Sequence, residues 1–148
     1  MVLAGSNAPN EAAVEFFARF HRLSDVALLA LRLVVGTSFL IHGWKKLAMW
    51  KTQPSERLPG GLLSTLRLLS VAEPLGGAAI VVGFLTQAAA VGFALVMLGA
   101  IRLKAFQMHK RFSGEGGWEF ELTVLAAAIV LLVFGAGGLS LDHLVWGL

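Results

Sequence analysis

The sequence contains four long runs of predominantly apolar residues, and these runs constrain the fold more than any other feature. A helix rises about 1.5 Å per residue, so about 20 apolar residues cross the roughly 30 Å hydrocarbon core of a bilayer. The four runs are Val26–Trp44, Leu66–Thr86, Ala88–Phe106 and a segment from Trp118 or Glu119 to Gly138. Because the connections are short, neighbouring helices should be antiparallel. We therefore predict an all-α membrane protein with a bundle of four transmembrane helices.

The composition supports a membrane protein and excludes several classes of function. Hydrophobic residues make up 57% of the chain and charged residues 14%, whereas a soluble domain has about 25% charged residues. The chain has no cysteine, which excludes disulfide scaffolds, thiol redox chemistry and covalently attached c-type haem. Any redox role therefore needs a bound cofactor or a partner. The basic residues flank the apolar runs, so the net charge of +3 indicates membrane topology and no nucleic-acid partner is predicted.

The segment that precedes the first apolar run has a different pattern. Between Asn10 and Leu23, phenylalanines alternate with charged residues at helical spacing, and Glu15 precedes Arg19 by four residues. This pattern is typical of an amphipathic helix that lies in the bilayer surface. We predict two units: an N-terminal segment (residues 1–25) with an interfacial helix, and a transmembrane domain (residues 26–148). Ser24 and Asp25 are candidate N-cap residues for the first span.

Basic residues are distributed unequally between the two ends of the predicted bundle. Three of the 12 lysines and arginines lie on the side of the termini, and nine lie on the side of the first and third loops. Basic loops usually remain in the cytoplasm. We therefore predict that both termini lie on the outer, periplasmic side of a bacterial inner membrane. The first loop, about residues 47–65, is long enough to form a small lid or a partner surface.

Ionisable side chains inside the predicted spans form two groups at different depths. Such groups are costly in a membrane and often mark a functional site. The group near the first and third loops contains His42, Lys45, Lys46, Glu73, Arg102, Lys104, His109, Glu119 and Glu121. The group near the termini contains Arg32 and Asp142, which are predicted to form a pair that is either structural or functional.

Helical periodicity assigns an inward face to each span. Small residues let helices approach closely, so the faces that carry glycine or alanine are predicted to point inward. The faces are Arg32, Gly36, Phe39, Gly43 and Lys46 in the first span; Glu73, Gly76, Gly77 and Gly83 in the second; Ala88, Gly92, Leu95, Gly99, Arg102, Phe106 and His109 in the third; and Glu119, Thr123 and Ala126 in the fourth. Together they are predicted to converge on one polar pocket.

Such a pocket could serve three purposes: binding a quinone, binding a metal ion, or conducting protons or a solute. A quinone ring could accept hydrogen bonds from histidine, lysine or arginine while a glutamate transfers protons. A metal ion is a weaker alternative, because its nitrogen and oxygen ligands would come from four separate helices without a local motif; that set is His42, Glu73, His109 and Glu119. A path for protons or a solute could use the same residues. The lysines at the helix ends also have a simpler role as interfacial anchors.

Four blocks of sequence occur in the order typical of a known family. They are LRLVVGTSFLIHGWKKL (Leu31–Leu47), EPLGGAAIVVGFLT (Glu73–Thr86), GGWE (Gly116–Glu119) and GAGGLSLD (Gly135–Asp142). In these blocks the chain resembles the DoxX/DoxD-like family of small four-helix membrane proteins. Matching positions include Arg32, His42, Lys46, Glu73, His109, Glu119 and Asp142. The long first loop, the amphipathic N-terminal helix and the extra carboxylate of Glu121 depart from the family pattern.

The resemblance implies a small subunit of membrane-bound redox machinery, as in members linked to quinone-dependent oxidation of thiosulfate. The leading prediction is a subunit of a quinone-linked oxidoreductase or respiratory-type complex that works with other subunits. In its intramembrane pocket, Glu73 and Glu119 would handle protons, while hydrogen bonds to the ligand would come from His42, Lys46, Arg102 and His109. One alternative is a structural, assembly or anchoring subunit without its own chemistry. Another is a small path for protons or a solute.

Overall fold

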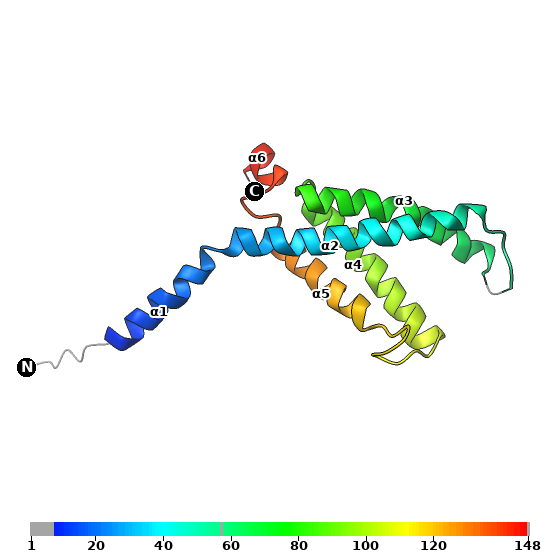
Figure 1. The fold of residues 1–148 in the computed structure, drawn as a ribbon, viewed down its shortest axis with the longest axis horizontal. Coiled ribbons are helices and arrows are strands. Elements are labelled where there is room, and N and C mark those ends of the chain that lie inside the picture. Colours follow the sequence, from blue (N-terminus) through cyan, green and yellow to red (C-terminus); the bar gives the residue numbers. More distant parts are fainter. Residues whose placement is uncertain (1–7, 57, 148) are drawn as a thin grey trace, which may run out of the picture.

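The computed structural model describes residues 8–56 and 58–147. The first seven residues of the predicted N-terminal segment and Arg57 of the first loop lie outside the described part. The helices are α1 (Ala8–His21), α2 (Ser24–Lys46), η1 (Leu47–Lys51), α3 (Gly60–Val82), α4 (Thr86–Ile101), η2 (Arg102–Gln107), α5 (Glu119–Phe134) and α6 (Leu141–Trp146) (Figure 1). The described residues contain no strand, and their one extended pairing is an isolated bridge between Ser55 and Leu58. The predicted all-helical class is confirmed.

Three helical segments in the described part are long and apolar enough to cross a membrane. They are Ser24–Lys51, Gly60–Val82 and Thr86–Gln107. Helix α5 has 16 residues, or about 24 Å at about 1.5 Å per residue. It ends at Gly135, whose φ of 72° and ψ of −156° suit glycine almost exclusively. The fourth apolar segment is therefore shorter as a helix than predicted, and its crossing of the membrane stays a prediction.

The first loop is smaller than predicted because helical structure enters it from both sides. Helix η1 continues α2, and α3 begins directly after Pro59 rather than at Leu66. Arg67 of α3 holds η1 in place: its Nε donates to the carbonyl of Met49 (3.1 Å) and its Nη2 to that of Thr52 (2.9 Å). The indole nitrogen of Trp50 donates to Ser70 Oγ (2.8 Å). Arg67 and Trp50 therefore hold η1 against α3.

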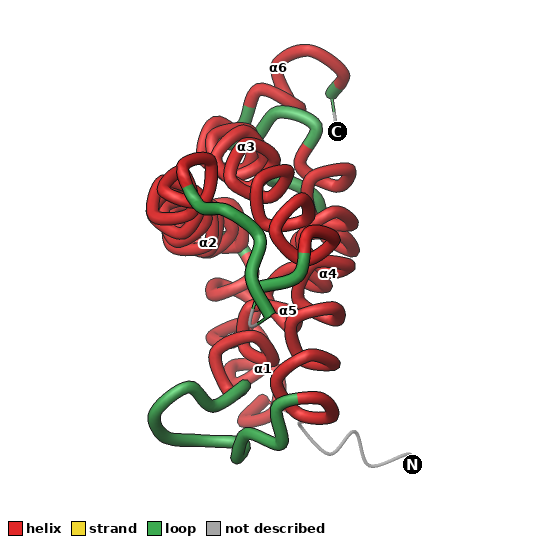
Figure 2. Tube along the Cα trace, turned by 90° about the vertical axis from the view of Figure 1, so that its right-hand side faces the viewer, coloured by secondary structure: helices red, strands yellow, loops and turns green. Residues whose placement is uncertain are grey.

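The four long helices form two antiparallel hairpins set at an angle to one another. Helix α2 packs along α3, and α4 packs along α5, with fewer contacts between the pairs. The pairs meet near the start of α4 and diverge toward η1 and η2 (Figures 1 and 2). Where they meet, the rings of Phe39 and Phe93 stack with centroids 3.5 Å apart. This stack belongs to one apolar core that also contains Val35, Ile80, Ala90, Met97, Val124, Ala128 and Leu131.

Glycines allow α2 and α3 to touch through their backbones. A Cβ atom added to Gly36 would lie 2.6 Å from the carbonyl oxygen of Gly77, and one added to Gly77 would lie 2.6 Å from that of Gly36. Farther along the seam, Gly43 packs directly against the ring of Pro74. The inward faces predicted for the first and second spans are therefore confirmed.

The faces predicted to point inward in the third and fourth spans do not enter the apolar core. Of the face predicted for the third span, Leu95, Gly99 and Arg102 line the open space between the two hairpins. The exposed residues include Gly92, Leu95, Gly99, Phe106, Glu119, Thr123 and Ala126. Helix α4 instead buries Thr86, Ala90, Phe93 and Met97, and α5 buries Glu121, Val124, Ala128 and Leu131. Large side chains bury more apolar area than glycine does. Phe93 and Met97 therefore determine which side of α4 enters the core.

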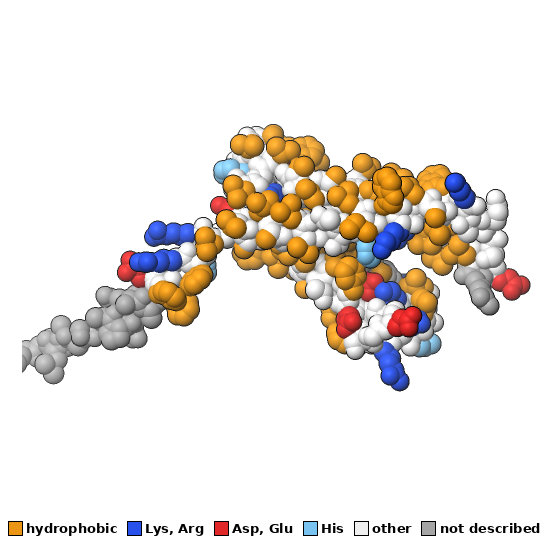
Figure 3. All heavy atoms as spheres, viewed as in Figure 1, with side chains coloured by type: hydrophobic (Ala, Val, Ile, Leu, Met, Phe, Trp, Pro, Cys, Tyr) orange, Lys and Arg blue, Asp and Glu red, His pale blue; other side chains and the backbone are white. Residues whose placement is uncertain are grey.

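Helix α1 extends away from the two hairpins (Figure 1). Phe16, Phe17 and Phe20 are more than half exposed, and the ring of Phe16 meets the other two edge-on at 5.5 and 5.4 Å. Over residues 14–21 of α1, apolar side chains gather on one side and charged side chains on the other (Figure 3). The predicted amphipathic helix is confirmed as a helix, and its position in the bilayer surface stays a prediction.

Candidate functional site

A cleft of about 870 Å³ lies where the two hairpins diverge. All four long helices supply its walls, and most of the lining is apolar, from residues such as Leu66, Leu69, Leu95 and Val96. The polar lining is His42, Lys46, Glu73, Arg102, Lys104, Gln107 and Glu121, together with Ser38 and Thr65. In Figure 3, acidic, basic and histidine side chains gather in the angle between α2 and the α4–α5 hairpin. The cleft therefore combines a large apolar wall with a cluster of ionisable groups.

One ion pair joins α2 to α3 in this cleft. Lys46 Nζ lies 2.5 Å from Glu73 Oε1. The Glu73 side chain is 2% exposed and that of Lys46 is 26% exposed. Lys46 lies in the last turn of α2, where the helix dipole favours a cation. The ammonium group is therefore the part of this pair that faces the open cleft.

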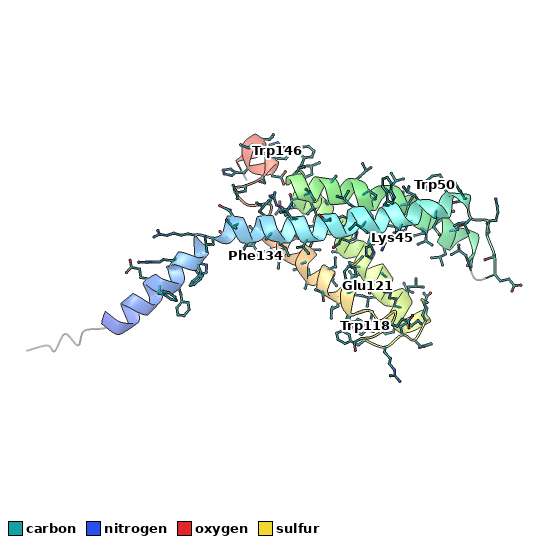
Figure 4. The ribbon with its side chains drawn as sticks, in the orientation of Figure 1. Lys45, Trp50, Trp118, Glu121, Phe134 and Trp146 are labelled. Atoms are coloured by element: carbon teal, nitrogen blue, oxygen red, sulfur yellow. The ribbon has the colours of Figure 1, made fainter. Side chains whose placement is uncertain are left out.

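A second ion pair joins the end of the α4 segment to α5. Lys104 Nζ lies 2.6 Å from Glu121 Oε1 and also donates to the carbonyl of Gly117 (3.1 Å). Lys104 is part of η2, a stretch of π-helix, and such stretches often occur at functional sites. Figure 4 shows Glu121 on α5, one turn beyond Trp118 at the start of that helix. Its side chain is 10% exposed, against 29% for Lys104.

Each of the two carboxylates uses only one oxygen in these pairs. The Oε2 atoms of Glu73 and Glu121 are buried and accept no hydrogen bond from any residue that the structure describes. An unsatisfied buried oxygen is costly, and in native proteins it calls for a specific explanation. Because each lysine is more exposed than its glutamate partner, the two lysines lie between the glutamates and the open part of the cleft.

The structure brings four of the six predicted pocket residues to the cleft, namely His42, Lys46, Glu73 and Arg102. His42 stacks on Phe120 of α5, with centroids 5.3 Å apart and an interplanar angle of 13°. Arg102 lines the cleft from η2, alongside the Lys46–Glu73 pair. Glu119 and His109 are exposed and do not line it. His109 follows η2 with a positive φ of 49°.

The sequence placed Lys104 and Glu121 in the loop-side polar group, but neither residue was predicted to belong to the pocket. On a helix, Glu121 is turned about 200° from Glu119. Glu121 also shares the spacing of Val124 and Ala128, which both enter the core. That apolar periodicity was the signal that could have assigned Glu121, and not Glu119, to the inside.

The alternative metal set does not assemble. Among residues 8–56 and 58–147, no three histidine, cysteine, aspartate or glutamate side chains gather closely enough to hold a metal ion. Of the four candidates, His42 and Glu73 line the cleft, whereas His109 and Glu119 do not. Two of the four predicted metal ligands therefore lie in the cleft and two lie outside it.

Asp142 has a clear structural role at the other end of the molecule. Its Oδ1 accepts from the amide of Leu85 (2.7 Å), and its Oδ2 accepts from the amide of Thr86 (2.9 Å). Its own amide donates to the carbonyl of Gly83 (2.7 Å). Helix α4 has no side-chain cap from its own N-cap residue, Leu85. Asp142 therefore caps α4 from a position 56 residues later in the chain.

Arg32 is 1% exposed and supports the same region. Its Nη2 donates to the carbonyl of Leu139 (2.5 Å), and its guanidinium is attracted by Asp142 without a direct hydrogen bond between the two described side chains. Asp25 accepts from the amide of Gly138 (2.8 Å) rather than capping α2. Arg32 and Asp142 thus stabilise the α5–α6 connection, mainly through backbone groups.

Comparison with known proteins assigns the chain to a family. The DoxX family model matches residues 27–110, more than half of the chain. The inner membrane protein YqjF of Escherichia coli is 30% identical over 131 residues, which cover 84% of this chain and 95% of YqjF. CatD of Bacillus subtilis, whose name provisionally assigns it to the oxidoreductases, is 30% identical over 82% of this chain and 89% of CatD.

A membrane protein of Mycobacterium tuberculosis that carries no functional name is also 30% identical, over 97% of this chain and 93% of that protein. No solved structure matches the chain significantly. The family match and these long alignments agree with the apolar helices of the structure, whose exposed side chains contact lipid. The chain is therefore a membrane protein of the DoxX family.

Proposed function

We propose that the chain is the quinone-binding subunit of an oxidoreductase complex in the bacterial inner membrane. The observation that carries this proposal is the cleft, in which an apolar wall meets two Lys–Glu ion pairs. Its volume of about 870 Å³ falls within the roughly 300–1,000 Å³ of small-molecule sites. The apolar wall suits an isoprenoid tail, and the ionisable cluster suits a ring with two carbonyl oxygens. The name of CatD points in the same direction.

In this proposal the cleft residues have distinct tasks. Lys46, Lys104, Arg102 and His42 donate hydrogen bonds to the ring oxygens, because their donor groups line the open cleft. Glu73 and Glu121 hold the two lysines and exchange protons with the site. Glu121 takes the place predicted for Glu119, which is exposed. Electrons would come from a partner subunit.

The proposal also includes the arrangement in the membrane. Helix α5 would be the fourth transmembrane helix, shorter than the others, and both termini would lie on the periplasmic side. The excess of basic residues beside the first and third loops supports this orientation. Helix α1 would lie in the outer surface of the bilayer, with its phenylalanines in the lipid.

Filling the cleft should weaken quinone binding without unfolding the protein. A side chain at Gly99 would enter the cleft, and a Cβ atom there meets no other atom within 4 Å. We expect Gly99→Phe to weaken binding of a short-chain ubiquinone by about tenfold or more, a loss of about 1.4 kcal/mol. Binding is measured by quenching of tryptophan fluorescence in lipid nanodiscs.

The matched control is Gly92→Phe. Gly92 lies two turns away on the same helix, also has open space at its Cβ position, and does not line the cleft. This variant should bind quinone like the wild type. Equal loss in both variants, or no quinone binding by the wild-type protein, would count against the proposed function.

A second candidate function is that of a structural subunit in a larger membrane complex. It is favoured by the geometry of the two ion pairs, each of which ties together two helical segments. Exchanging the partners, with Lys46→Glu and Glu73→Lys in one variant, separates the two functions. Each single substitution should lower stability by placing two like charges side by side. If the pair is purely structural, the double variant regains both the thermal stability and the complex activity that the single variants lose. A quinone site predicts that stability recovers while quinone binding does not, because the ammonium no longer lies on α2.

A further inference from the structure

We propose that the cleft binds its quinone ring preferentially as an anion, either the one-electron-reduced semiquinone or another ring with a single negative charge. This inference rests on the proposed function and adds the charge state of the ligand.

The charges that line the cleft do not cancel. Lys46 is neutralised by Glu73, and Lys104 by Glu121. Arg102 also lines the cleft, is exposed, and forms no ion pair with any described residue. The lining therefore carries one excess positive charge, and His42 contributes a further group able to donate a hydrogen bond.

The arrangement of the ion pairs increases this positive character. The lysine side chains are 26% and 29% exposed, whereas their glutamate partners are 2% and 10% exposed. The second oxygens of both carboxylates are fully buried. A ligand in the cleft thus meets ammonium and guanidinium groups before it meets a carboxylate. Lysine and arginine only donate hydrogen bonds, so they favour ring oxygens with increased negative charge.

An apolar wall strengthens the attraction between these groups and an anion. Opposite charges attract more strongly where water is excluded than in bulk water. A quinone that accepts one electron from a haem or an iron–sulfur centre of a partner becomes a semiquinone anion, with no bond broken and no proton taken up. Stabilising this anion would let a two-electron carrier exchange its electrons one at a time.

The charge preference can be tested with two probes of the same shape. A 2-hydroxy-3-alkyl-1,4-naphthoquinone is ionised at neutral pH, and its 2-methoxy ether is neutral. The full-length protein is placed in nanodiscs of phosphatidylcholine, and binding to empty nanodiscs is subtracted for each probe. We expect the anionic probe to bind about tenfold more tightly than the ether.

Arg102 is the residue whose charge should matter most, because it belongs to neither ion pair. Arg102→Met should weaken binding of the anionic probe about tenfold more than binding of the ether, so that the preference for the anion is lost. The control is Lys45→Met, which removes an exposed charge next to Lys46 but outside the cleft lining, and it should keep the preference. If Arg102→Met does not fold, Arg102→Gln serves as the second variant.

The possible results separate the two proposals. Equal affinities for the two probes in the wild type, or an anion preference that persists in a folded Arg102 variant, would overturn this inference while leaving the quinone site intact. Failure of both probes to bind would overturn the proposed function and this inference together. Titration of the quinone-loaded protein with dithionite gives an independent check: the semiquinone signal in electron paramagnetic resonance should be larger in the wild type than in Arg102→Met.

Discussion

Replacing Asp142 with alanine is expected to destabilise the protein by about 2–6 kcal/mol, because two amides lose their acceptor at a cost of about 1–3 kcal/mol each. Asp142 is buried, and its carboxylate accepts from the amides of Leu85 and Thr86. Alanine would leave both amides unsatisfied at the start of α4. It would also remove the nearby negative charge that attracts the buried guanidinium of Arg32. Equilibrium unfolding in mixed detergent–SDS micelles measures this loss.

Two comparisons test this account of Asp142. Asp142→Asn keeps one acceptor oxygen and the side-chain volume, so it should lose less stability than alanine. Glu119→Ala removes an exposed carboxylate from α5 and should change stability by no more than about 0.5 kcal/mol. A loss for Asp142→Ala as small as that for Glu119→Ala would show that Asp142 does not hold α4 in place.

The second large effect is expected at the contact between α2 and α3. Gly36→Ala and Gly77→Ala should each destabilise the protein by about 1–3 kcal/mol, the range for inserting a methyl group into a packed interface. In both cases the new Cβ atom would lie 2.6 Å from a backbone carbonyl oxygen of the opposite helix. A backbone cannot rotate away as a side chain can, so the helices must separate. Separation would also pull Lys46 away from Glu73.

The same substitution elsewhere provides the control. Gly92 and Gly99 are helical glycines with open space at the Cβ position. Gly92→Ala and Gly99→Ala should leave stability unchanged or raise it by up to about 1 kcal/mol, because alanine favours helix over glycine. Thermal unfolding of all four variants in one detergent tests the difference. Similar stability of Gly36→Ala and Gly92→Ala would contradict the backbone contact.

The first two spans were predictable in detail because one kind of residue determines their packing. Gly36 and Gly43 share a helical face with Arg32 and Phe39, and Gly77 shares one with Glu73. Close backbone contact needs small residues. In α2 and α3 the small residues and the charged residues lie on the same face, so either kind of residue identifies the face that points inward.

In α4 and α5 the faces that carry small residues are not the faces that enter the apolar core. The glycines of α4 face away from the core, and packing depends on Phe93 and Met97. A glycine in an apolar helix therefore has two possible positions: at a close contact with another helix, or on a face that no other helix covers. Gly99 belongs to the second kind, since it lines the cleft. A single helical sequence does not distinguish the two positions, because the difference depends on how far away the neighbouring helix is.

By itself, the sequence determined that this protein is helical and resides in a membrane, because long apolar runs with few charges have no other stable environment. It also indicated that the ionisable groups near the first and third loops form one cluster. Only the tertiary structure decided the membership of that cluster. The angle between the hairpins opens a cleft that includes Lys104 and Glu121 and leaves out His109 and Glu119. That angle depends on side chains from different helices, such as Phe39 against Phe93, and on caps supplied from far along the chain, such as Asp142 for α4.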